Sequence, residues 1–212
     1  MNSRFVLGVD LGQAHDYTAL VVIERAETEL HARHIERLPL ATPYPDQVDR
    51  VAELVSSPEL ARDVLVAVDG TGVGRAVVDL LRTALKPFRT PLVAVTITGG
   101  TATSRVGSRW SVPKRDLIAA AQVVLQTKRL KIAAGLPTAQ TLVDELTAYR
   151  VKVSEDGHDS YGNGRDAPND DLVLATAIAV YATTQKRGAR VVHAGPAERD
   201  DEMPIMRLVR LK

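Results

Sequence analysis

Aspartates end two of the most apolar stretches of the sequence and begin a third. They are Asp10 after residues 5–9, Asp69 after residues 64–68, and the pair Asp170 and Asp171 before residues 172–182. If the first two stretches form neighbouring parallel strands, their ends lie roughly 5 Å apart. Carboxylates that close repel each other when ionised, so they share a proton or hold a cation. The arrangement is typical of a metal-dependent nuclease, and we expect a divalent cation at this site.

The composition predicts one ordinary domain with a substantial core. The chain has 212 residues, of which 45% are hydrophobic and 25% are charged. It contains no cysteine, which excludes disulfides, thiolate metal sites and a cysteine nucleophile and is compatible with a reducing cytoplasm. The longest apolar stretch, residues 172–182, is too short to span a membrane, and the charged N-terminus does not resemble a signal peptide. We therefore expect a cytoplasmic protein without a membrane partner.

Charge is unevenly distributed along the chain, although the net charge is only +1. Residues 99–131 contain one acid, Asp116, and seven basic residues: Arg105, Arg109, Lys114, Arg115, Lys128, Arg129 and Lys131. Residues 155–171 are acidic, with Arg165 as their one basic residue. The first segment favours phosphate and the second favours metal. The alternative, that both are ordinary solvated surfaces, stays open at this point.

The hydrophobic periodicity predicts a mixed α/β sheet flanked by helices. Three strands come first, at residues 4–11, 17–24 and 29–38, the first two forming a hairpin; further strands follow at 64–69 and 91–98. Helices are predicted after Pro45 and at residues 74–85, 114–127, 138–149 and 169–185. Residues 154–169 are predicted to form a mobile loop. The domain is expected to span residues 1–188, with residues 189–212 as a basic tail or an extra strand.

Several short motifs together resemble the ribonuclease-H-like nuclease domain of phage terminase large subunits, over residues 5–182. They are Gly8-Val9-Asp10-Leu11-Gly12 followed by Asp16, Val68-Asp69-Gly70-Thr71-Gly72, Val112-Pro113-Lys114, Asp144-Glu145-Leu146 and Asn169-Asp170-Asp171-Leu172. The resemblance implies a sheet of five or more strands. Its first three strands are antiparallel, and the strand of Asp69 is parallel to that of Asp10. The helix that begins at Asp170 and Asp171 then crosses the edge where both aspartates emerge.

The resemblance also implies a set of metal ligands. Asp10, Asp69 and Asp171 are expected to bind two divalent ions, with Asp16 and Asp170 as auxiliary ligands, and Asp171 is preferred over Asp170 as the direct ligand. Oxygen ligands favour Mg²⁺ or Mn²⁺ over Zn²⁺. Two such ions generate a hydroxide nucleophile and stabilise the leaving oxygen during phosphodiester hydrolysis. The sequence departs from the usual family pattern at Asn169, where the family has histidine, and at Leu174, where it often has an acid.

Basic residues at the start of a predicted helix are candidates for binding DNA. Lys114 and Arg115, with Arg109 and Arg105 just before them, would contact phosphates without reading sequence. The resemblance implies double-stranded DNA as substrate in a bacterial host cell. It also implies a separate packaging ATPase, a small terminase subunit or a portal as protein partners. No G-x-x-x-x-G-K-S/T phosphate loop is present, so the packaging motor would lie elsewhere.

Other interpretations fit part of the same pattern. Asp10-Leu11-Gly12 and Asp69-Gly70-Thr71-Gly72 also resemble the phosphate loops of sugar kinases and actin-like ATPases, which normally need two related domains. A Holliday-junction resolvase shares the set of acids. Asp170 and Asp171 have a commoner role as helix caps, and Asp16 has one as a turn former. Trp110 stacks on a base or, more commonly, packs in a core, and among the five histidines only His158 lies near the acids in sequence.

Overall fold

A computed structural model describes residues 3–61, 63–71, 74–153, 159–162 and 169–185. Its main sheet has eight strands in the order β6-β7-β5-β4-β1-β2-β3-β8. Strands β1 and β2 are antiparallel, as are β2 and β3, whereas β4 lies parallel to β1 and β5 lies parallel to β4. The strands are β1 (Phe5–Asp10), β2 (Ala19–Arg25), β3 (Leu30–Arg37), β4 (Val64–Asp69), β5 (Leu92–Thr98), β6 (Ser104–Val106), β7 (Arg109–Pro113) and β8 (Leu130–Ile132).

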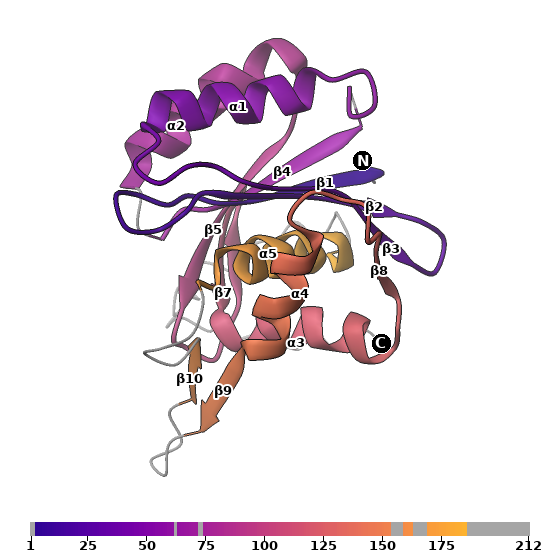
Figure 1. Ribbon diagram of the computed structural model, residues 1–212. Helices are drawn as coiled ribbons and strands as arrows, with labels where there is room; N and C mark the ends of the chain where they lie inside the picture. Colours follow the sequence, from indigo (N-terminus) through magenta and orange to yellow (C-terminus); the bar gives the residue numbers. More distant parts are fainter. Residues whose placement is uncertain (1–2, 62, 72–73, 154–158, 163–168, 186–212) are drawn as a thin grey trace, which may run out of the picture.

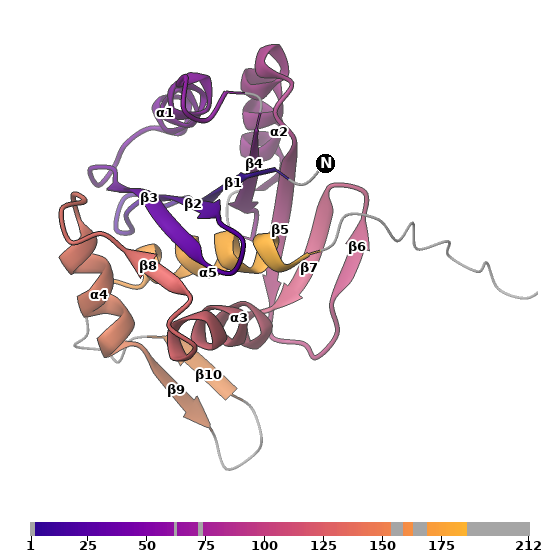
Figure 2. The ribbon, with the colours of Figure 1, turned by 90° about the vertical axis from the view of Figure 1, so that its right-hand side faces the viewer.

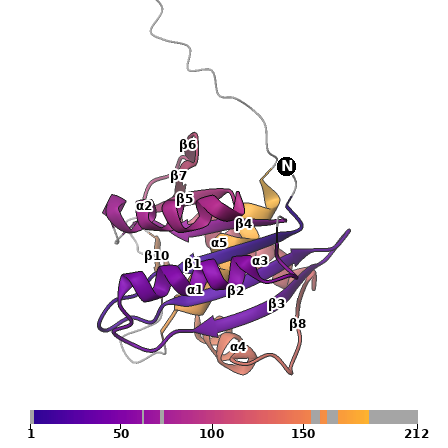
Figure 3. The same cartoon turned by 90° about the horizontal axis from the view of Figure 1, so that it is seen from above.

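Helices cover both faces of this sheet. Helices α1 (Tyr44–Ser56) and α2 (Gly74–Leu85) lie on one face, and α2 continues into the short 3-10 helix η1 (Lys86–Phe88) (Figures 1 and 3). On the other face, α5 (Asp171–Thr184) lies against the sheet, and α3 (Lys114–Gln126) and α4 (Ala139–Ala148) pack on α5. A separate hairpin of β9 (Arg150–Val153) and β10 (Asp159–Gly162) extends away from the sheet beyond α3 and α4 (Figure 2).

The alternation of side chains along the central strands builds two cores. Successive residues of a strand point to opposite faces, so a strand between two helical layers needs apolar residues at nearly every position. Leu7, Val9, Val66 and Val68 accordingly belong to the core beneath α1 and α2. Val6 and Ala67 belong to the core beneath α5. The uninterrupted valine-rich stretches of the sequence are therefore the signature of strands buried on both sides.

Small residues allow α5 to approach the sheet closely. A Cβ atom on Gly8 would lie 2.1 Å from the carbonyl oxygen of Ala175 and 2.8 Å from the Cβ of Ala179. Only glycine fits between β1 and α5 at this position. Most residues of α5 are buried, so the helix has no solvated face of the kind that an ordinary surface helix shows. This packing places the first turn of α5 close to the end of β1.

The predicted strands and helices are confirmed, and the sheet is larger than its five predictable strands. The short strands β6, β7 and β8 were not predicted, because three to five residues carry too little periodicity. The prediction of a loop over residues 154–169 is wrong at β10, which pairs with β9. His158 and the predicted tail at residues 189–212 lie outside the described residues. Within the described part of the chain, no helix has the length and apolar character needed to cross a membrane.

Candidate active site

Asp10 and Asp69 emerge side by side from the sheet. They end the neighbouring parallel strands β1 and β4, where Val9 pairs with Val68. Along each strand Asp10 follows Val6 by four residues and Asp69 follows Ala67 by two, so both project toward the face that α5 covers. Both aspartates are partly buried. The prediction that the two strands are parallel neighbours is therefore confirmed, and with it the common sheet edge.

Helix α5 brings two more acids to this edge. Asp170 precedes the helix and Asp171 is its first residue. Burial raises the pKa of Asp10 well above its usual value, and the negative charges of Asp69, Asp171 and Asp170 raise it further, in that order. Lys114 acts in the opposite direction on Asp10. Three acids from two distant segments are thus close enough to Asp10 to raise its pKa.

Asp69 is oriented by the residue two positions after it. Its Oδ1 accepts hydrogen bonds from the N–H of Thr71 (2.8 Å) and from Thr71 Oγ1 (2.5 Å). Thr71 Oγ1 in turn accepts the N–H of Ile97 on β5 (2.8 Å). Burial raises the pKa of Asp69, while the bonds from Thr71 and the charge of Lys114 oppose that rise. Thr71 therefore fixes the orientation of the Asp69 carboxylate and ties it to β5.

Asp171 is held by an arginine at the end of β3. Arg37 donates from Nε to Oδ2 of Asp171 (2.8 Å) and from Nη2 to Oδ1 (3.1 Å). Arg37 Nη2 also donates to Oε1 of Glu145, a buried residue of α4. Burial raises the pKa of Asp171, and Arg37 opposes this rise. Burial also raises the pKa of Glu145 to about 7, assisted by the charge of Asp171 and opposed by Arg37.

The turn after Asp10 is fixed from two sides. The N–H of Gly12 donates to Thr18 Oγ1 (3.0 Å), and the buried Gln47 of α1 donates from Nε2 to the carbonyl oxygen of Gly12 (3.0 Å). Asp16 lies exposed in this connection, where its N–H donates to the carbonyl of Gln13 (3.2 Å). It is not among the acids that act on Asp10. Its position suits the turn-forming role, and its role as an auxiliary ligand stays a prediction.

The donor set has the chemistry that Mg²⁺ and Mn²⁺ prefer, since it consists of carboxylate oxygens. As the side chains stand, no three His, Asp or Glu residues within the described ranges are arranged around a common ion position. Arg37 binds both oxygens of Asp171, and Thr71 binds one oxygen of Asp69. A carboxylate can accept about four hydrogen bonds or metal contacts in all. The carboxylates therefore fit a divalent ion chemically, and Arg37 and Thr71 orient the two of them to which they donate.

Of the predicted DNA-binding residues, Lys114 lies beside the acids, and Arg115 follows it at the start of α3, whereas Arg105 on β6 contacts Gln185 at the opposite end of α5 and Arg109 begins β7. Lys114 Nζ lies 3.7 Å from Oδ2 of Asp170, next to the acids. Arg115 donates to the carbonyl oxygen of Thr101 (3.0 Å). Arg105 stacks on the ring of Trp110 at 4.2 Å and donates to Gln185, and Arg109 is exposed. Their role in binding DNA stays a prediction.

Trp110 packs in the core and does not present its ring to solvent. It is buried on β7, with Arg105 on one side and the ring of Tyr181 in an edge-on contact at 6.4 Å. The side chain of Asp170, the N-cap residue of α5, makes no capping hydrogen bond. The simple capping interpretation of this aspartate is therefore not supported.

The family model described as the terminase RNaseH-like domain matches residues 7–182 of the chain. The chain belongs to this family. The match contains Asp10, Asp69, Asp170 and Asp171, and confirms the family resemblance of the sequence motifs. No curated protein matches the chain.

Solved structures agree with the terminase RNaseH-like assignment. The large terminase nuclease from thermophilic phage G20c with bound magnesium has a TM-score of 0.58 and 22% identity, covering 83% of this chain and 79% of that one. The manganese-soaked terminase nuclease domain of human cytomegalovirus has a TM-score of 0.54 and 13% identity, covering 83% and 81%. The large terminase of another thermophilic bacteriophage has a TM-score of 0.59 and 12% identity, covering 85% of this chain and 40% of that one. At these identities the likeness concerns the fold, which is ribonuclease-H-like as expected.

Two residues of this terminase RNaseH-like site were not predicted from the sequence as site residues. Arg37 ends a strand like many other surface arginines, and nothing in its sequence context identifies it. Glu145 had a usable signal, because it lies three residues after Leu142 and one before Leu146 on the apolar side of α4, and both leucines pack in the core. An acid on a buried helix face requires a partner. The sequence does not reveal that the partner comes from β3.

Proposed function

We propose that this chain is the nuclease part of a phage DNA-packaging terminase, a metal-dependent endonuclease that hydrolyses phosphodiester bonds in double-stranded DNA. The observation that carries the proposal is the convergence of Asp10 with Asp69, Asp171 and Asp170 at one sheet edge. Family membership supports it. Further support comes from G20c nuclease structures with bound magnesium and with bound cobalt.

The proposed ligands of two Mg²⁺ or Mn²⁺ ions are Asp10, Asp69 and Asp171, with Asp170 and Asp16 as auxiliary ligands. When bound, the ions supply an activated water and stabilise the departing oxygen of the phosphodiester. The chain's own part is to hold Asp10, Asp69 and Asp171 together in a partly buried place, where burial raises the pKa of each of these three carboxyl groups. Thr71 and Arg37 keep Asp69 and Asp171 in fixed orientations.

Basic residues beside the acids would hold the DNA backbone. Lys114 lies next to Asp170 at the start of α3, within electrostatic reach of Asp10 and Asp69. From there its ammonium group would reach a phosphate at the reacting position, with Arg115, Arg109 and Arg105 contacting neighbouring phosphates. Such contacts orient the duplex without reading its sequence. A packaging ATPase, a small terminase subunit or a portal would act together with this nuclease.

Cleavage of supercoiled plasmid in Mn²⁺ tests the catalytic assignment. We expect Asp10→Ala, Asp69→Ala and Asp171→Ala each to lower the rate by at least about 10³-fold, because several kcal/mol of transition-state stabilisation would be lost. Asp79→Ala is the matched control, since Asp79 is an exposed aspartate of α2 that pairs with Arg82. Undiminished cutting by the Asp10 or Asp69 variant would refute the role. ATP hydrolysis without plasmid cleavage would favour the actin-like alternative.

Binding of duplex DNA over a range of salt concentrations tests the basic surface. We expect the double variant Lys114→Ala with Arg115→Ala to bind more weakly and to lose about two units of the slope of log affinity against log salt, since each phosphate contact contributes about 0.9. The control is Lys86→Ala with Arg89→Ala, two exposed charges just before β5, at the other end of the sheet. Equal slopes in the two double variants would place the DNA elsewhere.

A further inference from the structure

We propose that Arg37 and Glu145 are positioning residues that hold Asp171 and the first turn of α5 in the geometry that a divalent cation requires. The inference rests on the proposed metal-binding function and concerns two residues that the ligand set does not include.

The contact between Arg37 and Asp171 fixes the plane of the carboxylate. Two N–H groups of one guanidinium meet the two oxygens of one carboxylate, at 2.8 Å and 3.1 Å. Such paired contacts restrict rotation as well as position. Lysine would offer a point charge without this geometry. The lone pairs that Arg37 leaves unused on Asp171 stay available to a cation.

Glu145 connects Arg37 to the backbone of α5. Its Oε1 accepts from Arg37, and its Oε2 accepts from the N–H groups of Leu172 (3.2 Å) and Val173 (3.4 Å). These N–H groups belong to the unpaired first turn of the helix, which a capping side chain normally satisfies. Asp170 at the N-cap makes no such bond. A buried acid from α4 therefore caps α5 and leaves Asp170 free to face Lys114.

The register of the sheet places Arg37 in line with Asp10. Asp10 pairs with Ala19 across β1 and β2, and Ala19 pairs with Arg37 across β2 and β3. Arg37 follows Ile35 by two residues, and Ile35 lies in the core beneath α5, so Arg37 projects to the same face as Asp10. Two strand spacings separate them, about 10 Å. Asp171 is bound by Arg37 and acts electrostatically on Asp10, so it lies between the two.

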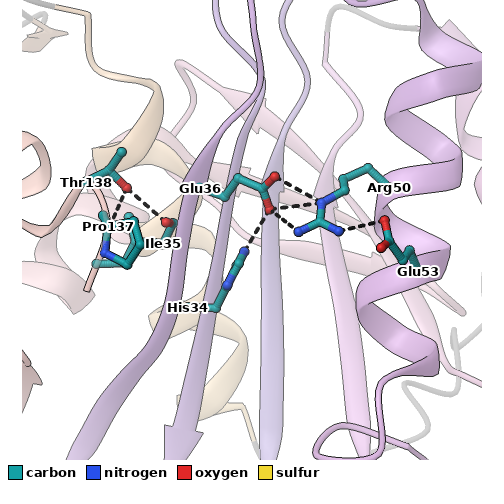
Figure 4. Close-up of polar contacts among 7 residues, drawn as sticks. All are labelled: His34, Ile35, Glu36, Arg50, Glu53, Pro137 and Thr138. Carbon is teal, nitrogen blue, oxygen red and sulfur yellow. Dashed lines mark hydrogen bonds and ion pairs between the residues drawn. The ribbon is translucent and has the colours of Figure 1, made fainter. Parts of the chain in front are cut away.

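The end of β3 is anchored on both sides of the sheet (Figure 4). Glu36 receives three hydrogen bonds from Arg50 of α1, at 3.0 to 3.1 Å. The carbonyl oxygen of Ile35 accepts from Thr138 Oγ1, just before α4, at 2.9 Å. The guanidinium of Arg37 also stacks on the ring of Tyr17 at 4.6 Å. Arg37 is thus held by its strand and by its side chain, as a positioning residue must be.

Calorimetric titration of the full chain with Mn²⁺ alone tests this arrangement without relying on cleavage. We expect Arg37→Gln and Glu145→Gln to raise the Mn²⁺ dissociation constant by about 10- to 100-fold, the usual effect of losing an outer partner of a metal ligand. Arg37→Lys keeps the charge and is expected to fall between these variants and the wild type. Arg33→Gln is the matched control, because Arg33 is on the same strand and also pairs with a buried acid, Glu24.

A second readout separates positioning from a purely structural role. Saturating Mn²⁺ is expected to restore plasmid cleavage in Arg37→Lys and Glu145→Gln, whereas Asp171→Ala stays inactive at any concentration. If Arg37→Gln does not fold, these two variants decide the question.

Dissociation constants within threefold of the wild type in folded Arg37 and Glu145 variants would overturn the inference while leaving the proposed function intact. Tighter Mn²⁺ binding by these variants would overturn it as well, since Arg37 would then only repel the cation. A wild-type chain that binds no Mn²⁺ would overturn the proposed function and this inference together.

Discussion

Two acids at opposite ends of the β1–β2 pair have pKa values shifted in opposite directions. Glu24 lies across from Phe5 at the beginning of β1, and Asp10 lies at its end. Glu24 is buried, yet Arg33 and Arg4 donate to its two oxygens, at 2.5 Å and 2.6 Å. Burial opposes ionisation there, but these bonds and charges hold the pKa of Glu24 below its usual value. Burial raises the pKa of Asp10 instead, and the charges of the neighbouring acids Asp69, Asp171 and Asp170 raise it further.

Glu24 is therefore expected to stabilise the folded protein, whereas Asp10 and its neighbouring acids are expected to destabilise it. A carboxylate with two arginines contributes favourable free energy in the folded state. Carboxylates that repel one another make the folded state less stable at neutral pH, and such an arrangement is commonly retained where function needs it. At Asp10 a divalent cation would add to the positive charge of Lys114, which alone leaves the pKa of Asp10 raised.

Added metal ion is expected to give the largest effect. At about 100 times its dissociation constant, Mn²⁺ should raise the free energy of unfolding of the wild type by about 2.7 kcal/mol. The rise should be absent in Asp10→Asn and unchanged in Glu24→Gln. Urea denaturation with and without Mn²⁺ measures it. An equal rise in the Asp10 variant would show that the ion binds elsewhere.

Neutralising the paired acid is expected to destabilise the protein. Glu24→Gln should lower the free energy of unfolding by roughly 1 to 2 kcal/mol at neutral pH, because hydrogen bonds to a charged group are lost. The loss stays this small because both arginine side chains are more than half exposed. The plasmid cleavage rate should not change. Urea denaturation in EDTA provides the measurement. If the variant is as stable as the wild type, the ion pairs of Glu24 with Arg4 and Arg33 do not stabilise the folded protein.

Neutralising the unpaired acid is expected to have the opposite sign. In EDTA, Asp10→Asn should raise the free energy of unfolding at neutral pH by about 1 kcal/mol, since relief of a functional charge cluster typically gives gains of this order. A raised folded-state pKa means that the wild type loses stability as pH rises from the unfolded value of 3.8. Asp10→Asn should lack this loss. A destabilised variant with no change in pH dependence would contradict the assignment of repulsion.

The smallest expected effect concerns acid pH. Because the pKa of Glu24 is lowered, its stabilisation is fully present above the unfolded value of 4.5 and is lost as pH falls through the folded value. The stability difference between the wild type and Glu24→Gln should therefore shrink below about pH 4.5 and be constant above it. Urea midpoints measured from pH 3 to pH 7 test this. A difference that persists at pH 3 would assign the loss to packing.

Much of the scaffold follows from local sequence patterns. Valine-rich stretches that end in aspartate predicted β1 and β4, and helical spacing predicted α1 to α5 within a few residues. The sequence motifs also predicted the group of Asp10, Asp69 and the Asp170–Asp171 pair. The short strands β6 to β8 were not predicted, because they are stabilised more by pairing with neighbouring strands than by the strand preference of their own residues. Strand β10 was not predicted for the same reason: its sequence has no apolar alternation, and it forms a strand by pairing with β9.

The order of buried and polar residues along the chain determined which segments become strands, because a strand between two helical layers must be apolar on both faces. It also determined where carboxylates would end those strands. Only the tertiary structure decided which basic side chain pairs with each carboxylate. Arg37 and Asp171 are separated by 134 positions, and their pairing depends on strand register and on the close approach of α5 over Gly8. Ion pairs of this kind have no local sequence pattern, because they arise only after distant elements have packed.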